Sequence, residues 1–128
     1  MAKAYQLTIE DKGSYLHFRV SGPNTAESVR GYLGDVYFAC AQRERAAILI
    51  EENLEGPGLG LVDIFEIVTE GSERTWPHVR RLAYVDVNPA HSRPDMQFAE
   101  TVAVNRGINM RLFGSVAEAE QWLLSVAP

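Results

Sequence analysis

One stretch decides the fold, and it reads AAILIEENLEGPGLGLVDIFEIV from residue 46 to residue 68. An apolar run at residues 46–50 enters an acidic, glycine-rich segment, and a second apolar run at residues 61–68 leaves it. The first run is apolar on both faces, which is typical of an interior parallel strand. Pro57 favours a helix that begins shortly after it. The stretch therefore predicts a strand, a loop over residues 51–60 and a helix, the unit in which α/β proteins usually build their sites.

Before this unit, the pattern is one of strict alternation. Residues 5–10 and residues 16–20 each alternate apolar with polar side chains, which is the period of a strand with one wet face. Between the two runs, Asp11-Lys12-Gly13-Ser14 supplies turn residues, and Gly13 can adopt a positive φ. We expect an antiparallel hairpin, with residues 5–10 at one edge of the sheet.

Helices and strands alternate through the rest of the chain. Asn24 and Glu27 predict a capped helix start, and apolar residues then recur at helical spacing as far as Cys40. After the central unit we expect strands at residues 82–87 and, more weakly, 110–113, and helices at residues 61–70, from Ser92 or Pro94 to Asn105, and at residues 115–126. Ser115 and Glu118 form a capping box for the last helix.

The resulting order, ββαβαβαβα, predicts one α/β domain over residues 1–128. An N-terminal β-hairpin precedes βαβαβα crossovers, giving a mixed, mostly parallel sheet of about five strands with about four helices. Crossovers between parallel strands are right-handed, so sequential strand placement would put every helix on one face of the sheet. The opposite face would then stay partly open, with His17 and Arg19 on it.

Composition excludes several classes of function. The 12 Lys and Arg residues against 17 Asp and Glu residues give a net charge of -5, so no positive field is available to neutralise a phosphate backbone, and we expect no nucleic-acid partner. The longest apolar runs are about five residues, and a membrane span needs about 20. The N-terminus has no apolar signal core. Cys40 is the sole cysteine and cannot form an internal disulfide, which agrees with a cytoplasmic protein.

The acidic, glycine-rich segment invites two ligand hypotheses, and both are weak. A dinucleotide fingerprint would need a glycine where Leu61 stands, and Glu51, Glu52 and Glu55 would repel a pyrophosphate. The same carboxylates with Asn53 offer oxygens to a hard cation, but their spacing matches no calcium loop. We therefore interpret the segment as a tight turn with a solvated acidic surface, and we predict neither a metal nor a cofactor.

His91 is the strongest candidate for chemistry. Asp86, Asn88, His91 and Asp95 follow the strand at residues 82–87, and so should emerge at the same end of the sheet as the acidic segment. Convergence of Asp86 or Glu52 with His91 could orient an imidazole for acid–base work, and Glu55 is a further possible partner. The alternative, which we favour, is that Asn88 and Pro89 form a turn and that Ser92 and Asp95 cap a helix. No enzyme is therefore predicted.

Three features together resemble a known family. They are the order of elements, the acidic segment after residues 46–50, and the sequences AYVDVNP at residues 83–89 and FAETVAVNRG at residues 98–107. Over nearly its whole length the chain is similar to the small bacterial proteins of the SpoIIAA-like, STAS-related group, whose superfold is also related to SEC14-type lipid-binding domains. In the anti-sigma-factor antagonists of that group, a serine at the loop-to-helix junction is phosphorylated, and its charge decides whether a partner kinase docks.

This chain departs from that pattern at the junction itself. No Ser, Thr or Tyr occurs from Glu51 through Val68, so the phosphoacceptor is absent and the switch is not carried over. The resemblance still implies a docking surface on the loop and the following helix. The residues assigned to it are Glu51, Glu52, Asn53, Leu54, Glu55, Leu59, Val62, Asp63 and Glu66.

The leading hypothesis is accordingly a non-catalytic, STAS-like protein-interaction module of unknown process. The alternative is a carrier of a small apolar ligand or lipid, which rests on the SEC14-like relationship and on the apolar helix that begins at Leu61. Homodimerisation through the open sheet face or through the edge strand is a further expectation.

Overall fold

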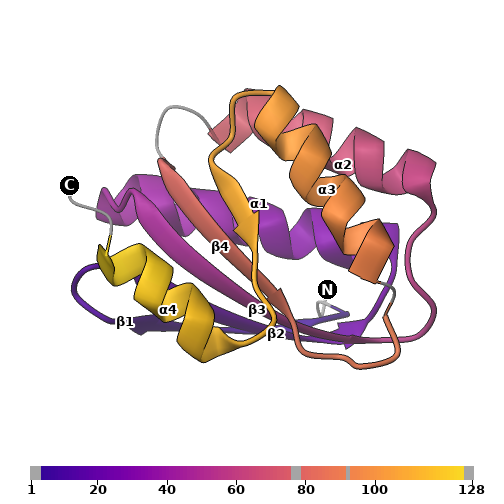
Figure 1. The fold of residues 1–128 in the computed structure, drawn as a ribbon, viewed down its shortest axis with the longest axis horizontal. Helices are drawn as coiled ribbons and strands as arrows, with labels where there is room; N and C mark the ends of the chain where they lie inside the picture. The colour runs from indigo at the N-terminus through magenta and orange to yellow at the C-terminus, as the bar shows by residue number, and fades with distance from the viewer. Residues whose placement is uncertain (1–3, 76–78, 92, 126–128) are drawn as a thin grey trace.

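The computed structural model describes residues 4–75, 79–91 and 93–125. Within these residues, five strands and four helices alternate in the predicted order (Figure 1). The strands are β1 Gln6–Asp11, β2 Leu16–Pro23, β3 Ala47–Glu55, β4 Arg81–Asp86 and β5 Met110–Leu112. The helices are α1 Ala26–Arg43, α2 Leu61–Thr75, α3 Arg93–Asn105 and α4 Val116–Ser125. The α/β class is confirmed, whereas the predicted helix boundaries at Ser92 and Val126 lie outside the described residues.

The strands form a single sheet in the order β1-β2-β3-β4-β5. β1 and β2 pair antiparallel as the expected hairpin, and every later pair is parallel. β3 is therefore central, and its neighbours β2 and β4 run in the same direction as β3. The mixed, mostly parallel sheet is confirmed.

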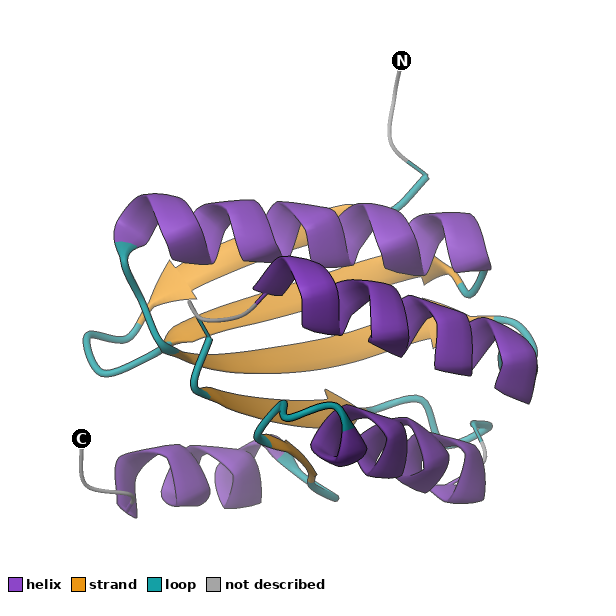
Figure 2. Cartoon of the chain, turned by 90° about the horizontal axis from the view of Figure 1, so that it is seen from above, coloured by secondary structure: helices purple, strands orange, loops and turns teal. Residues whose placement is uncertain are grey.

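The helices cover both faces of the sheet, as Figures 1 and 2 show together. α1, α2 and α3 pack over one face, where Phe18, Ile48 and Ile50 form part of the larger core. α4 packs over the other face, on the side chains of Leu49 and Val85. The expectation that all helices share one face is wrong. The reason is visible in the sequence, because strands that are apolar on both sides need a cover on each side.

His17 shows the consequence for the second face. Its side chain is buried, and its Nε2 lies 2.9 Å from Oε1 of Glu51 on the adjacent strand. Arg19 remains exposed, and its Nε lies 3.3 Å from the same Glu51 oxygen. The face that was expected to be open is thus closed around His17.

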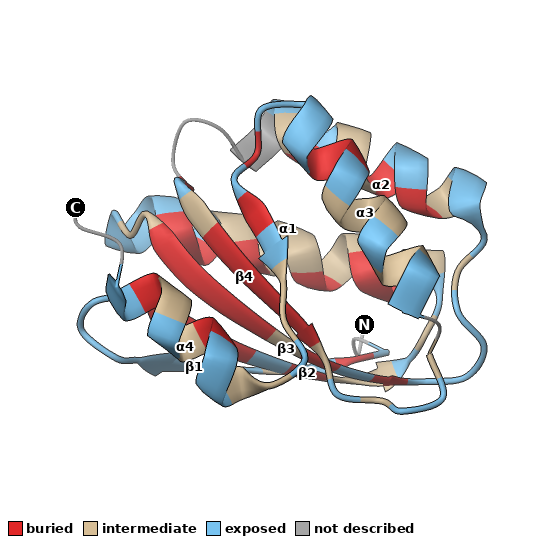
Figure 3. Cartoon of the chain, viewed as in Figure 1, coloured by how far each residue is buried: buried red, intermediate tan, exposed pale blue. Residues whose placement is uncertain are grey.

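β3 runs five residues beyond the predicted strand end at Ile50. Residues 51–55 keep their parallel pairing with β2 as far as Pro23 opposite Glu55. Because side chains alternate along a strand, Glu52 and Leu54 turn toward α1, α2 and α3 and are buried, while Asn53 and Glu55 are exposed. Buried residues run along the central strands of the sheet (Figure 3). The prediction of a loop from Glu51 onward is therefore wrong.

The start of α1 also differs from the prediction. Thr25, in an extended conformation with φ -122°, caps the helix, and its Oγ1 accepts a hydrogen bond from the backbone N–H of Ser28 at 3.1 Å. Asn24, the predicted cap, instead donates from its side chain to the carbonyl of Pro57 at 3.0 Å. None of the described helices is long and apolar enough to cross a membrane.

Candidate functional site

Two carboxylates meet at the carboxyl end of the central strands. Glu52 on β3 and Asp86 on β4 are partners in the parallel register, and both lie on the face covered by α1, α2 and α3. Glu52 is 4% exposed, and the side chain of Asp86 is almost as well buried. This end of a parallel sheet is where ligands commonly bind in α/β folds.

Two tyrosines hold the carboxylate of Glu52. The hydroxyl of Tyr32, on α1, donates a hydrogen bond to Oε2 of Glu52, and the hydroxyl of Tyr84, on β4, is also hydrogen-bonded to Glu52. Burial raises the pKa of Glu52 and the nearby Asp86 adds to the rise, although both tyrosine hydroxyls oppose it. Burial and the charge of Glu52 hold the pKa of Tyr32 and of Tyr84 well above the usual value, so both hydroxyls stay protonated donors.

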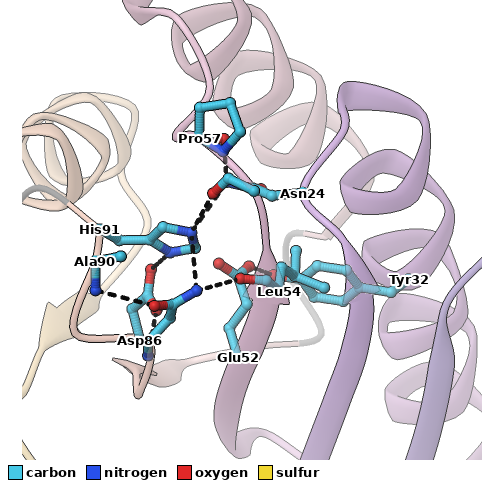
Figure 4. Close-up of polar contacts among 10 residues, drawn as sticks. Asn24, Tyr32, Glu52, Leu54, Pro57, Asp86, Ala90 and His91 are labelled. Carbon is cyan, nitrogen blue, oxygen red and sulfur yellow. Dashed lines mark hydrogen bonds and ion pairs between the residues drawn. The ribbon is translucent and has the colours of Figure 1, made fainter.

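His91 lies between Asp86 and the chain that leaves β3 (Figure 4). Its Nδ1 is 2.6 Å from Oδ2 of Asp86, and its Nε2 is 3.0 Å from the carbonyl oxygen of Gly56. A carboxylate and a carbonyl only accept, so these two contacts suit an imidazolium that donates from both nitrogens. The side-chain amide nitrogens of Asn88 and Asn24 lie farther from Nε2, at 3.4 and 3.5 Å. Burial opposes the charged form, but the hydrogen bond and charge of Asp86 outweigh it, so the pKa of His91 is raised.

Polar groups from other segments bind the backbone around this contact. The side-chain amide of Asn88 donates to the carbonyl of Leu54 at 2.7 Å. Asn24 donates from its backbone N–H to the carbonyl of Glu55 at 2.7 Å, and from its side chain to that of Pro57. With His91 on Gly56, the carbonyls of residues 54, 55, 56 and 57 each accept a hydrogen bond from outside the segment. We call residues 54–57 the anchored turn.

The same cluster offers potential metal ligands. Among the described residues, Glu52, Asp86 and His91 place one ligand atom each within 4.8 Å of one another. A ligating imidazole nitrogen must be unprotonated, whereas Nδ1 of His91 faces the Asp86 carboxylate and the shortest contact of Nε2, at 3.0 Å, is with the Gly56 carbonyl. The contacts therefore favour a hydrogen-bonded network over a metal centre.

A cavity of about 90 Å³ lies between the sheet and the helices α1, α2 and α3. Glu52, Tyr32, Tyr84 and Asn24 contribute polar groups to its wall. Most of its lining is apolar: Val29, Leu33, Ile50, Leu59, Ile64, Ile67, Val68, Leu82, Met96, Ala99, Ala103, Ile108 and Met110. Small-molecule pockets usually reach roughly 300 Å³ or more, so this cavity is too small for a lipid.

A larger hollow of about 340 Å³ lies elsewhere, on the outer surface between β1 and α1. Leu7, Ile9 and Phe38 are among its lining residues, and α2 does not contribute to it. The apolar helix that motivated the carrier hypothesis therefore borders only the smaller of these two spaces.

The residues assigned to the docking surface fall into three groups. Asn53, Glu55, Val62 and Glu66 are exposed, while Leu59 and Asp63 are partly buried. Glu51 is partly buried on the α4 side of the sheet, where it pairs with His17 and Arg19. Glu52 and Leu54 are buried under the helices, so neither side chain is part of the exposed surface to which the prediction assigned it.

Sequence reasoning missed four residues of this region. Leu61 and Phe65 on α2 are apolar and exposed, and they extend the surface around Val62. Tyr32 and Tyr84 bind Glu52 from the helix layer and from the sheet. For Glu52 the sequence held a usable indication. Alternate residues of a strand lie on the same face, so Glu52 would share the buried face of Ile48 and Ile50 if the strand continued.

Comparison with solved structures gives a likeness over nearly the whole chain. No family model matches the sequence, and no curated protein matches it. The crystal structure of an anti-sigma factor antagonist from Mycobacterium paratuberculosis is similar, with a TM-score of 0.63 and 17% sequence identity. The match covers 98% of this chain and 98% of that one. The SpoIIAA-like, STAS-type fold inferred from the sequence is thus confirmed.

Proposed function

We propose that this chain, which has the fold of an anti-sigma factor antagonist, is a non-catalytic module that binds another protein through the outer face of α2 and the anchored turn. The observation that supports this most directly is a cluster of exposed apolar side chains on one helix. Leu61 is 51% exposed, Val62 70% and Phe65 42%. Neighbouring apolar side chains left in water often mark a binding surface.

Acidic side chains surround this cluster. Glu55 ends β3, Asp63 lies in the first turn of α2, and Glu66 follows Phe65. Arg30 on α1 lies 3.5 Å from Glu66, and Arg106 stacks over the ring of Phe65, so two cations border the cluster. We infer that the partner presents an apolar anchor with basic residues around it, because charge complementarity fixes orientation and speeds association.

The anchored turn supports the proposal in a second way. A loop that is already held in its bound shape loses less conformational entropy when a partner docks. The carbonyls of residues 54–57 are each fixed by Asn24, Asn88 or His91, so the chain between β3 and α2 begins from a set position. His91 is thus a positioning residue, and the proposal assigns it no chemical step.

Phosphorylation at this junction is not part of the proposal. The sequence from Glu51 through Val68 holds no Ser, Thr or Tyr, so we infer that docking here does not depend on a phosphate at the loop-to-helix junction. Regulation of the interaction would then come from the abundance of the partner or from another site on this chain.

Partner binding tests the proposal with two matched variants. Partners that co-purify with the tagged protein from its own host would be measured against Val62→Asp on α2 and Leu124→Asp on α4. Leu124 is 57% exposed and lies on the other side of the sheet. We expect Val62→Asp to lower partner recovery by about tenfold or more, since a hot-spot loss exceeds about 1.4 kcal/mol. Full recovery with Val62→Asp would contradict the proposal.

Homodimerisation and a cytoplasmic location stay predictions. α4 occupies part of the second sheet face, which leaves the edge strand β1 as the more accessible self-pairing surface. Native mass spectrometry of gently purified protein would separate a dimer from a complex with another chain.

A further inference from the structure

We propose that the cavity beneath α2 binds a small organic cation, with an apolar body in the cavity and an ammonium group paired with Glu52. The inference goes beyond protein docking and does not depend on it. It rests on the shape of the cavity, on the apolar groups that line it, and on one buried carboxylate in its wall.

The lining and volume of the cavity suit a small apolar body. Ile64, Ile67 and Val68 from α2 face Ile50 and Leu82 of the sheet across the cavity. α2 packs mainly against α1 and α3, so these side chains leave space above the strands. A cavity of about 90 Å³ holds about three times the liquid volume of one water molecule and is smaller than the 150 Å³ engineered cavity that accepts benzene. A ligand of a few heavy atoms fits, or the apolar end of a longer one, because the cavity is partly open.

The charges of Glu52, Asp86 and His91 determine which kind of ligand the cavity favours. His91, when protonated, pairs with Asp86 at 2.6 Å, and its charge also acts on Glu52, so one imidazolium serves both carboxylates. The direct partners of Glu52 are the hydroxyls of Tyr32 and Tyr84, which are neutral. Among the ion pairs of the described residues, none joins Glu52 to a Lys or Arg. Two ionised carboxylates with at most one imidazolium leave a net negative charge beside the apolar space, which favours a cation there over a neutral or anionic occupant.

Glu52 should distinguish small molecules of the same size by their charge. An alcohol of the same size could donate one hydrogen bond to Glu52 but would bring no charge. A carboxylic acid anion would meet both Glu52 and the adjacent Asp86, and like charges at short range repel. The affinity of the site should therefore be highest for an alkylammonium, lower for the alcohol and lowest for the carboxylate.

NMR titration at pH 8 would test this ranking with three probes that share a four-carbon body: n-butylammonium, n-butanol and n-butyrate. Saturable shifts of the methyl signals of Ile64, Ile67 and Val68 would report occupancy of the cavity. We expect saturation with butylammonium, at least about tenfold weaker binding of butanol, and no binding of butyrate.

Two variants separate the roles of charge and space. Glu52→Gln keeps the shape of the side chain and removes its charge, and should weaken butylammonium at least about tenfold while leaving butanol unchanged. Glu55→Gln is the matched control, because Glu55 is exposed outside the cavity, and it should bind butylammonium like the wild type. Ala99→Leu adds volume to the lining from α3 and should abolish binding of both probes.

Several results would overturn the inference. They are equal affinity for butylammonium and butanol, unchanged butylammonium binding by folded Glu52→Gln, and saturable shifts that appear on exposed acidic residues in place of the cavity. An absence of saturable shifts with every probe would also overturn it.

Discussion

Glu52 is the residue in which burial, hydrogen bonding and charge act most strongly against one another. Its carboxylate lies under the helices, accepts hydrogen bonds from two tyrosines, and neighbours a second carboxylate on the next strand. Such a group is costly to keep charged, and an isosteric neutral side chain would keep its packing and lose that cost. Its pKa therefore predicts a measurable dependence of stability on pH.

The prediction for Glu52→Gln follows from the sign of this shift. The folded-state pKa of Glu52 is raised above the ordinary 4.5, so its contribution to stability is complete below that pH and is lost as the pH rises through the folded-state value. The variant should therefore gain stability relative to wild type as the pH rises from about 4.5. Urea unfolding of both proteins across this range would measure the difference. A difference that does not change with pH would contradict the assigned shift.

The pKa of His91 is shifted in the same direction as that of Glu52, but the consequence for stability differs. Its pKa is raised above 6.5, so the stability that it adds is complete below pH 6.5 and declines as the pH rises through its folded-state pKa. At pH 6 we expect His91→Gln to cost about 1.5–3 kcal/mol, the usual value for hydrogen bonds to a charged group, and to cost less at higher pH. Urea unfolding at several pH values checks this, and a cost that grows with pH would refute it.

The loss of His91 should also be visible as a local change. His91 holds the carbonyl of Gly56, so its removal should speed amide exchange around the anchored turn more than in β4. A merely destabilised protein would show faster exchange everywhere.

At the scale of elements, the apolar pattern predicts that β2 and β3 exist but not where they end. Both strands were expected from their apolar residues, and both run longer than those residues indicate. The apolar pattern stops at Ile50, but pairing continues to Pro23 opposite Glu55 because the neighbouring strand is present to bond with. Propensity describes single segments, whereas a strand end is decided by its partner, so the buried positions of Glu52 and Leu54 were missed.

Gly22, in the extended part of β2, offers a test of how closely that part packs against the chain before β1. It has φ +137°, and a Cβ placed there would lie 2.9 Å from the backbone Cα of Tyr5. We expect Gly22→Ala to destabilise the protein by about 1–3 kcal/mol, because both the dihedral angle and the close backbone resist a side chain. Gly60→Ala is the control, since a Cβ there meets nothing within 4 Å. Thermal unfolding would compare the two, and equal midpoints would show that β2 tolerates a side chain at Gly22.

At the scale of the whole molecule, the two faces of the sheet differ in what they cover. α1, α2 and α3 enclose the larger core, the cavity and the carboxylate cluster, whereas α4 closes a smaller core on the opposite side. Element order was enough to predict the fold class and the parallel crossovers. It did not place α4, because the side on which a terminal helix packs depends on which sheet face still lacks a cover.

Two adjacent leucines test the role of α4. Leu123 is 3% exposed in the smaller core, and Leu124 is 57% exposed. We expect Leu123→Ala to cost about 2–4 kcal/mol through lost burial and the cavity left behind, and Leu124→Ala to stay within about 0.5 kcal/mol. Chemical denaturation of both variants measures the contrast. Similar costs for the two would mean that α4 does not cover the second face.

The anchored turn has a consequence for how this protein can diversify. Four of its main-chain carbonyls are held from outside by donors on neighbouring segments, and Gly56 at φ +111° supplies a backbone conformation that a larger side chain would strain. Glu55 is exposed within the turn, and Asn53 and Gly58 are exposed on either side of it. Natural drift, or a designed library at these three positions, could therefore change recognition while the scaffold beneath stays constant.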